Sequence, residues 1–547
     1  MPKKRASKTV KKSSSSIKKK TSPAKKKASS SKKRRPVALL IWDGFGISEN
    51  PNGNAIAHAK MPTFDRLWKK YPHALLKADG EAVGLPKGQV GNSEAGHMTI
   101  GAGRRVETDL VRINKEIKKN TFHDNPALLR AAAHVMRHHG VLHLMGLLTN
   151  HASGHSYPDH LYALLKFVEE LRLPRVILHL FTDGRDTPPY HAVKLVQELQ
   201  KRLPKNVYIG SIMGRYYAMD RNRFWERTKR AYDALVGCDA LHARDPIDAI
   251  EKAYARGESD EFIQPTFICP NKTCLRCIQD NDAVVFWNLR SDRARQLVKP
   301  FSMPDFEHVQ DGAFTRKIKR KHLFFVTLTD FGSDIANVVP AYGNRDIQGT
   351  LVEALRDQRQ YYIAESEKYV HVTYFFDGGH DQARFGEQRI NIPTHRVERY
   401  DQKPRMRACE IAKKIVKVIE KDADFVCANF ANADMVGHTG NFGATVTACE
   451  ALDDALCCVC KAIMKKKGTL IVMSDHGNAE LVIRKDGTPD TEHNSSPVPF
   501  LIAGTIPKGK RIRSLGELAD AAPTILDLMG IEIPELMNGL SLFRRGR

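Results

Sequence analysis

Short apolar runs alternate with amphipathic stretches along most of the chain. The runs are rich in valine, leucine and isoleucine and lack regular polar alternation, which is typical of strands buried on both faces. The stretches between them, such as Leu161–Leu171 and Ala192–Leu203, have helical periodicity. This order predicts an α/β fold with mostly parallel sheets. The predicted strands are Val37–Trp42, Val141–Leu148, Val176–Phe181, Val207–Ile212, Ala283–Trp287, Leu323–Leu328, Phe425–Asn429 and Leu470–Ser474.

Carboxylates and imidazoles form one group of polar residues at or beyond the ends of these strands. In parallel sheets, ligands bind at the carboxyl ends of strands, so these side chains are candidate ligands. Carboxylate oxygens mixed with imidazole nitrogens suit Mn²⁺, Zn²⁺ or a related divalent ion. The group exceeds what one ion needs, so two ions are expected. Its members are Asp43, Asp434, His438, Asp475, His476 and His493.

Each member of this group also has an ordinary structural explanation. An aspartate after a strand is often a helix N-cap, and a single histidine commonly lies in a core or on a surface. Agreement among four separate loops is what favours a metal centre. Two metal ions can clamp a phosphoryl group and activate a hydroxyl at neutral pH.

A candidate for that hydroxyl is Ser93, in the segment Gly91–His97 with the sequence GNSEAGH. Glycine permits a sharp backbone path, so the segment is interpreted as a tight turn that exposes a nucleophile. The alternative is an ordinary loop serine. The pattern differs from the G-x-S-x-G nucleophile elbow, so activation of Ser93 is expected to come from the metal ions and not from His97.

Arginines form a second group at strand ends in the middle of the chain. They lie in Thr182–Pro189, Gly214–Arg221 and Asn288–Arg293, and His155 follows an earlier strand. Converging arginines are costly unless an anion lies among them, and their planar forks fit carboxylate and phosphate. The pattern therefore indicates a small acid that carries both groups. The alternative is a surface salt-bridge network that pairs the arginines with Asp186, Asp220 and Asp292.

Positive charge is concentrated in residues 1–35, which hold 16 lysines and arginines and no acidic residue. The rest of the chain has 70 basic residues against 62 acidic ones, so it carries only +8 of the net charge of +24. With little to bury, residues 1–35 are expected to be a disordered basic tail. Either a nucleic-acid-binding or nuclear-targeting arm, or a plain solvated extension, is consistent with this composition.

The ten cysteines are expected to be free thiols in a reducing compartment. Cys274-x2-Cys277 and Cys457-x2-Cys460 suggest zinc as an alternative, but the two pairs lie far apart in the chain. No apolar run approaches the roughly 20 residues of a spanning helix, and mean hydropathy is -0.41. The chain is therefore expected to be soluble, without membrane contact.

Taken in order, these motifs resemble those of the cofactor-independent (2,3-bisphosphoglycerate-independent) phosphoglycerate mutases of the alkaline phosphatase superfamily. The resemblance extends from about residue 36 to the C-terminus. It implies two α/β domains. An alkaline-phosphatase-like, metal-binding domain would comprise residues 36–107 and 342–547, and a substrate-binding transferase domain, residues 108–341, would be inserted into it.

The resemblance also implies a reaction and its residues. Ser93 would take the phosphoryl group of 3-phosphoglycerate and return it to the 2-hydroxyl of the retained glycerate, with Asp186 as general base. One metal ion would be held by Asp43, Ser93, Asp475 and His476, and the other by Asp434, His438 and His493. Substrate would be held by His155, Arg185, Asp186, Arg215, Arg221, Arg290, Arg293 and Lys368.

Further expectations come from the same resemblance. They are Mn²⁺ as the metal, with Mg²⁺, Co²⁺ or Zn²⁺ as alternatives, no need for 2,3-bisphosphoglycerate, a monomer, and a cytoplasmic location. The loop Thr149–Ser156 departs from the family pattern, which leaves His151 as a competitor of His155. A metal-dependent phosphatase or phosphopentomutase is the alternative enzyme, but the arginine-rich insert favours a mutase that retains its acid.

Overall fold

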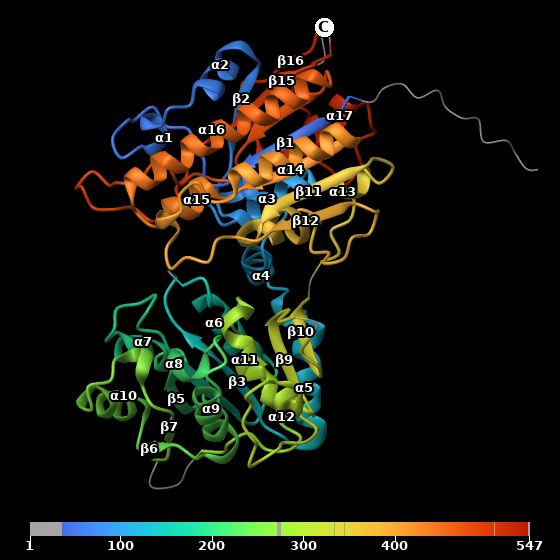
Figure 1. The fold of residues 1–547 in the computed structure, drawn as a ribbon. Coiled ribbons are helices and arrows are strands. Elements are labelled where there is room, and N and C mark those ends of the chain that lie inside the picture. Colours follow the sequence, from blue (N-terminus) through green and yellow to red (C-terminus); the bar gives the residue numbers. More distant parts are fainter. Residues whose placement is uncertain are drawn as a thin grey trace, which may run out of the picture.

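The computed structural model describes residues 35–151, 153–270, 275–332, 334–343, 345–507 and 509–544. The expected disordered tail therefore lies outside the described residues, except for Arg35, and so does Cys274. The described part forms two lobes, each built around an eight-stranded sheet (Figure 1). One sheet is formed by strands that come before and after, in sequence, the segment that forms the other sheet. This arrangement confirms an α/β fold in which one α/β domain is inserted into another.

The first sheet combines the two ends of the described chain, in the order β12-β11-β13-β1-β14-β15-β2-β17. Central β1 is parallel to both of its neighbours, whereas β15 is antiparallel to β14 and β2. The strands are β1 (Val37–Trp42), β2 (His73–Lys77), β11 (Gln360–Glu365), β12 (Gln388–Ile392), β13 (Phe425–Phe430), β14 (Thr469–Met473), β15 (Val498–Gly504) and β17 (Leu515–Glu517).

Helices cover both faces of this sheet, so β1 is buried throughout. Alternate residues of β1 belong to two cores: Leu39 packs with α3, α13 and α17, and Leu40 packs with α14 and α16. The main helices are α1 (Ala55–His58), α2 (Pro62–Lys70), α3 (Ser93–Ala102), α13 (Leu351–Ala354), α14 (Ala408–Lys421), α15 (Asn432–Gly437), α16 (Phe442–Lys465) and α17 (Ala521–Met529). Shorter elements are η1 (Gly80–Val83), η5 (Ser366–Lys368), η6 (His371–Phe375), η7 (Tyr400–Gln402), η8 (Leu518–Asp520), β16 (Arg511–Ile512) and β18 (Phe543–Arg544).

The second sheet lies wholly within residues 142–342, in the order β10-β9-β8-β3-β4-β5-β7-β6. All pairs are parallel except β5 with β7. The strands are β3 (Leu142–Leu148), β4 (Val176–Thr182), β5 (Val207–Gly214), β6 (Leu241–Ala243), β7 (Thr266–Ile268), β8 (Ala283–Phe286), β9 (Phe324–Thr329) and β10 (Val338–Tyr342). The helices are α4 (Asp109–Lys118), η2 (Phe122–Asp124), α5 (Pro126–His138), α6 (Pro158–Glu170), α7 (Ala192–Gln200), α8 (Arg215–Ala218), α9 (Trp225–Gly237), α10 (Pro246–Ala255), η3 (Asp260–Phe262), α11 (Ser291–Ser302) and α12 (Phe306–Val309).

Every strand predicted from the apolar runs is present. Seven have ends within one residue of the prediction, and β5 continues two residues further, to Gly214. The prediction missed partly exposed strands such as β12, and it also missed the buried strands β11 and β15. Among the described residues, no helix combines the length and the apolar character needed to cross a lipid bilayer.

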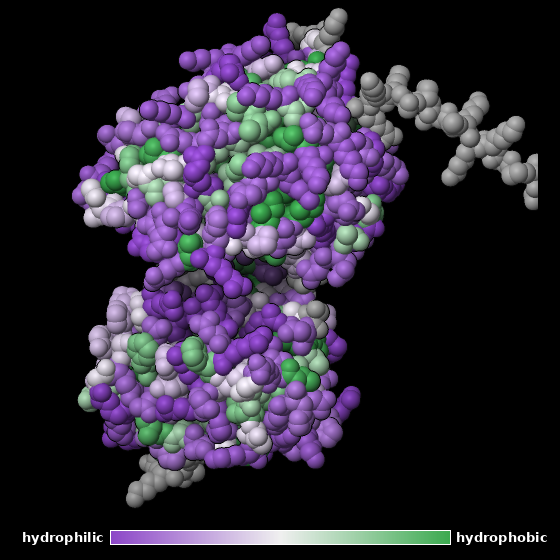
Figure 2. Space-filling view, viewed as in Figure 1, coloured by the Kyte–Doolittle hydropathy of each residue, from purple (hydrophilic) through white to green (hydrophobic). Residues whose placement is uncertain are grey.

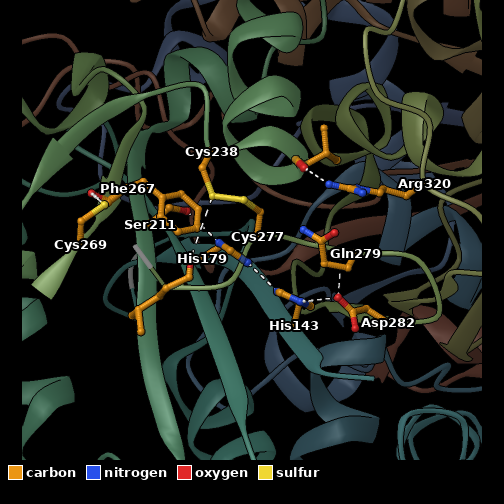
Figure 3. Close-up of a disulfide and its surroundings, with 12 residues drawn as sticks. His143, His179, Ser211, Cys238, Phe267, Cys269, Cys277, Gln279, Asp282 and Arg320 are labelled. Carbon is orange, nitrogen blue, oxygen red and sulfur yellow. Dashed lines mark hydrogen bonds and ion pairs between the residues drawn. A yellow bond between two sulfur atoms is a disulfide. The ribbon is translucent and has the colours of Figure 1, made fainter. Parts of the chain in front are cut away.

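A disulfide joins Cys238 and Cys277 (Figure 3), which corrects the expectation of free thiols throughout. Cys238 caps the C-terminus of α9, and Cys277 lies in the loop before β8. The two residues are 39 positions apart in sequence, yet the fold brings their Cα atoms to 5.9 Å, within the usual disulfide range. Cys457 and Cys460, on α16, are free thiols as expected.

Candidate active site

A cavity of about 1080 Å³ lies between the two lobes, where Figure 2 shows a hollow lined mainly by hydrophilic residues. Ser93, Lys368 and Asp434 line it from one lobe, and Ser153 and Arg290 line it from the other. Both sheets thus place predicted site residues on the walls of one cavity.

Ser93 is the first residue of α3, and the side chain of Asn92 caps that helix by accepting a hydrogen bond from the Ala95 N–H. The expected exposed turn is therefore wrong: Ser93 is only 6% exposed, because the segment continues as a helix. Gly96 allows α3 to pack closely on Asp475, whose backbone and Cβ would lie within 3 Å of any added Cβ. The Ser93 hydroxyl therefore lies at the positive end of a helix, where anions are stabilised.

Asp43, Asp475 and His476 surround the Ser93 hydroxyl. Its Oγ lies 3.1 Å from Oδ1 of Asp43 and 2.9 Å from Nε2 of His476. Oδ2 of Asp475 is buried and accepts no hydrogen bond of good geometry from any described residue. His97 Nδ1 lies 3.1 Å from it but is also 2.9 Å from the Ser93 carbonyl oxygen, to which it is hydrogen-bonded. A buried carboxylate oxygen left free beside a carboxylate and an imidazole fits a divalent cation.

Asp434, His438 and His493 form a second donor group. Asp434 Oδ1 lies 3.2 Å from Nε2 of His438 and 3.1 Å from Nε2 of His493, and the two Nε2 atoms are 3.0 Å apart. The Nδ1 atoms of both rings contact backbone carbonyls of Thr491 and Gly91 at 2.6 and 2.9 Å, so Nδ1–H donates there. In its neutral form, each ring would direct an Nε2 lone pair toward the Asp434 carboxylate. A metal ion satisfies this arrangement, and the backbone contacts orient both rings.

Lys368 lies between the two groups. Its Nζ is 2.7 Å from Asp43 Oδ1, 2.7 Å from Ser93 Oγ and 2.6 Å from Asp434 Oδ2. Burial alone would lower the pKa of Lys368, but the carboxylates of Asp43, Asp434 and Asp475 raise it above its usual value. The lysine is therefore an ammonium ion at neutral pH, in contact with the hydroxyl of Ser93.

The predicted arginines lie near one another in the second lobe, and Arg290 among them lines the cavity. Burial lowers the pKa of Arg293, and the positive charges of Arg221, Arg185 and Arg215 lower it further, so these guanidinium groups lie close enough to repel one another. Arg290 lines the same cavity as Ser93. This accumulation of charge matches the predicted anion site.

Acidic residues offset part of this charge, as the salt-bridge alternative required. Arg215 Nη1 lies 2.6 Å from Asp183 and 3.0 Å from Asp186, and Arg221 lies 2.9 Å from Asp292. The side chain of Asp220 instead accepts hydrogen bonds from Gln296 and from the backbone of Phe224, and pairs with Arg227, outside the predicted arginine set. Arg185 and Arg221 are half-exposed, so a ligand can reach both.

The structure separates the two candidate histidines. His155 is buried 3.6 Å from Asp292, and burial lowers its pKa to about 4, with Arg215 and Arg290 contributing. His151 is 60% exposed, lies 3.8 Å from Asp159, and packs against Tyr157. His155 is therefore the histidine that lies among the arginines.

Several residues that contact the predicted groups were missed by sequence reasoning. Asn429 donates to Asp43 Oδ2 at 2.7 Å, Asn478 donates to Asp434 Oδ1 at 3.2 Å, and Ser153 donates to Asp186 at 2.6 Å. Asp183, the partner of Arg215, directly follows β4. The strand-end rule that found the arginines would have found Asp183, whereas no sequence signal marks Asn478 or Ser153.

Comparison with known proteins first places the chain among metal-dependent enzymes. The profile of the metalloenzyme superfamily matches residues 35–533. The chain is 44% identical to a 2,3-bisphosphoglycerate-independent phosphoglycerate mutase from Clostridium perfringens (strain SM101 / Type A), over 94% of this chain and all of the relative. It is 43% identical to the enzyme of that name from Moorella thermoacetica, over 94% of this chain and 99% of the relative. A crystal structure of Leishmania mexicana phosphoglycerate mutase at low cobalt concentration has a TM-score of 0.68 and 27% identity, covering 93% of this chain and 98% of that one.

The chain therefore belongs to the 2,3-bisphosphoglycerate-independent phosphoglycerate mutases, a family of isomerases within the metalloenzyme superfamily. Its dependence on divalent metal is supported by this membership and by two clusters of donor atoms, each within 4.8 Å of one another: Asp43, His97 and Asp475, and Asp434, His476 and His493.

Proposed function

We propose that the chain interconverts 3-phosphoglycerate and 2-phosphoglycerate, in glycolysis and gluconeogenesis, through a phosphoserine at Ser93. One observation carries the assignment: the Ser93 hydroxyl, at the N-terminus of α3, contacts Lys368, His476 and Asp43 in a cavity that Arg290 lines from the other lobe. A phosphatase needs only the first half of this arrangement. A mutase also has to hold the dephosphorylated acid until the phosphoryl group returns.

The metal-binding lobe would act on the phosphoryl group. The ammonium of Lys368 and the N–H groups at the start of α3 stabilise negative charge on the transferred phosphoryl oxygens. When bound, two divalent ions would lower the pKa of the Ser93 hydroxyl and neutralise phosphoryl charge. We assign one ion to Asp43, Ser93, Asp475 and His476, the other to Asp434, His438 and His493. Mn²⁺ is our proposed metal, with Mg²⁺, Co²⁺ and Zn²⁺ as alternatives.

The arginine lobe would hold the glycerate. The guanidinium groups pair with the carboxylate and with the phosphate of the product, so that the acid stays bound while it reorients. Although burial raises the pKa of Asp186, the hydrogen bond from Ser153 and the charge of Arg215 bring it below its usual value. Asp186 is therefore ionised and can accept a proton from a glycerate hydroxyl. The proposed ligands are His155, Arg185, Asp186, Arg215, Arg221, Arg290 and Arg293.

The boundaries of the two domains stay part of the proposal: 36–107 with 342–547, and 108–341. Both connections between the sheets run past the cavity, since Glu107, Thr108 and Gly343 line it. Closure about these segments would exclude water and so protect phosphoserine from hydrolysis. A monomer in the cytoplasm completes the proposal, with the basic tail as the one part that could contact nucleic acid.

The decisive assay follows conversion of 3-phosphoglycerate with no 2,3-bisphosphoglycerate present. We expect activity that chelation abolishes and Mn²⁺ restores, with a phosphoryl group on Ser93 detectable by mass spectrometry after rapid acid quenching. Ser93→Ala should lose turnover and the phosphopeptide while keeping its circular dichroism spectrum. A strict requirement for 2,3-bisphosphoglycerate, or release of inorganic phosphate as the main product, would overturn the assignment.

A further inference from the structure

A buried chain of four polar side chains crosses the second sheet (Figure 3). His143 Nε2 lies 3.1 Å from Asp282 Oδ2, His143 Nδ1 lies 2.9 Å from His179 Nε2, and His179 Nδ1 lies 2.8 Å from Ser211 Oγ. All four side chains have zero exposure, and none belongs to the proposed site. These four side chains are therefore a buried, hydrogen-bonded set of groups that the proposed mechanism does not use.

Only one assignment of donor and acceptor atoms gives every one of these four side chains a hydrogen-bond partner. Asp282 also accepts hydrogen bonds from the backbone N–H groups of Val141, at 2.7 Å, and Gln279, at 2.7 Å. Although burial raises the pKa of Asp282, these donors and His143 lower it below its usual value, so the carboxylate can only accept. His143 then donates from Nε2 and accepts at Nδ1, His179 donates from Nε2 and accepts at Nδ1, and the Ser211 hydroxyl donates.

Both rings are neutral in this order. Burial lowers the pKa of His143 and of His179, and the second ring is further disfavoured as a cation by the first. Every hydrogen bond in this series has a defined donor and a defined acceptor. A shift of one strand relative to its neighbour would break these bonds, so the series stabilises the observed strand register.

The hydrogen-bonded series Asp282–His143–His179–Ser211 crosses four adjacent strands, in the order β8-β3-β4-β5. Asp282 immediately precedes β8, and one member lies in each of the other three strands. Beyond the carboxyl ends of the same four strands lie Arg290, His155, Asp186 and Arg215, the groups proposed to hold glycerate. The relative positions of these strands therefore set the geometry of the anion site.

The register between β4 and β5 contains an irregularity at this chain. Leu178 pairs with Ile209, but His179 pairs with Ser211, so Gly210 is an extra residue on β5. A Cβ at Gly210 would lie 2.5 Å from the Ile177 side chain, so the extra residue has to be glycine. The His179–Ser211 hydrogen bond joins the first pair after the bulge.

This bulge sets the register of the strand residues that lead into Arg215, the first residue of α8. Successive side chains of a strand point to opposite faces, so one extra residue reverses the facing of everything after it. The new register continues from Ser211 to Gly214, and Arg215 follows directly. In this register the Arg215 guanidinium reaches Asp183 and Asp186, at 2.6 and 3.0 Å.

We propose that the chain Asp282–His143–His179–Ser211 is a positioning device that holds the β5 bulge and thereby directs Arg215 into the glycerate site. His179 and Ser211 are positioning residues, since they act through Arg215 and do not touch substrate. The inference rests on the proposed function, because it assigns them an effect on glycerate binding.

The test compares Ser211→Ala, the mildest change, with His179→Leu. Each removes the hydrogen bond across the bulge, and we expect KM for 3-phosphoglycerate to rise about tenfold while kcat changes much less. His179→Gln, which keeps one donor and one acceptor, should restore KM to near the original value. The matched control is His160→Gln, because His160 is equally buried in the same lobe, on α6, but lies outside the chain.

The control variant should lose thermal stability with KM unchanged. If Ser211→Ala and His179→Leu also lose stability with KM unchanged, the four hydrogen-bonded side chains only stabilise the fold and the inference is wrong. A rise in KM that His179→Gln fails to reverse would equally overturn it, because the hydrogen bond would not be the cause. Absence of mutase activity in the unmodified protein would instead refute the proposed function, and with it this inference.

Discussion

Lys368→Met tests the contact between the two donor groups and Ser93. The substitution removes an ammonium that lies 2.6 to 2.7 Å from Asp43, Ser93 and Asp434, and leaves a side chain of similar length. Both carboxylates are fully buried, so without the lysine they face each other with less compensating charge. Breaking a buried ion pair in this way costs about 3–5 kcal/mol.

The expected result has a thermal and a kinetic part. In EDTA, the melting temperature should fall by on the order of 10 °C relative to the unmodified protein. Saturating Mn²⁺ should shrink this difference, because the metal cation neutralises the same carboxylates. In the mutase assay, kcat should fall by about 10²–10³-fold, the usual effect of removing one preorganised donor from a transition state.

Lys87→Met is the matched control, since Lys87 lines the same cavity but is exposed. It should change neither the melting temperature nor kcat appreciably. If Lys368→Met melts in EDTA at the temperature of the unmodified protein, its ammonium does not hold the two carboxylates together. If kcat stays within a few-fold, Lys368 does not act on the phosphoryl group.

Three further changes test other parts of the molecule. Reducing the disulfide that closes 39 residues should lower the free energy of unfolding by about 4 kcal/mol in urea. Cys238→Ser should lose correspondingly less on reduction, because, among the described cysteines, only the disulfide at Cys269 is left to reduce. Equal losses in the two proteins would contradict this. Burial raises the pKa of Glu365 to about 7, so the folded state binds this proton more tightly than the unfolded state and stability falls as pH rises from about 4.5 to 7. Glu365→Gln should therefore be more stable by about 3 kcal/mol at pH 8, with the gain vanishing near pH 4.5; a gain independent of pH would refute it. Deleting residues 1–35 should leave mutase activity unchanged and abolish retention on a DNA column, and unchanged retention would assign nucleic-acid binding elsewhere.

Much of the site could be predicted because its residues follow a local rule. Runs such as Val37–Trp42 are buried on both faces, so their apolar character is visible without knowledge of any partner. The residue after such a strand lies at the ligand-binding edge whatever the strand order, which is why Asp43 and Arg215 could be selected. Ser93 was selected for a turn that does not exist, yet its residue identity and spacing still marked it.

Tertiary structure decided what depends on register and on contacts between distant segments. Cys238 and Cys277 lie 5.9 Å apart only because α9 ends beside the loop that enters β8. His155 rather than His151 lies among the arginines because that loop folds inward at Asp292.

The β5 bulge at Gly210 is the clearest feature that could not be predicted from the sequence. Its neighbours have the same apolar pattern with or without the extra residue, so the sequence by itself determined a strand and the arginine after it. The face to which each β5 residue after Gly210 points was decided by the pairing with β4, because strand register is a property of two strands and not of one.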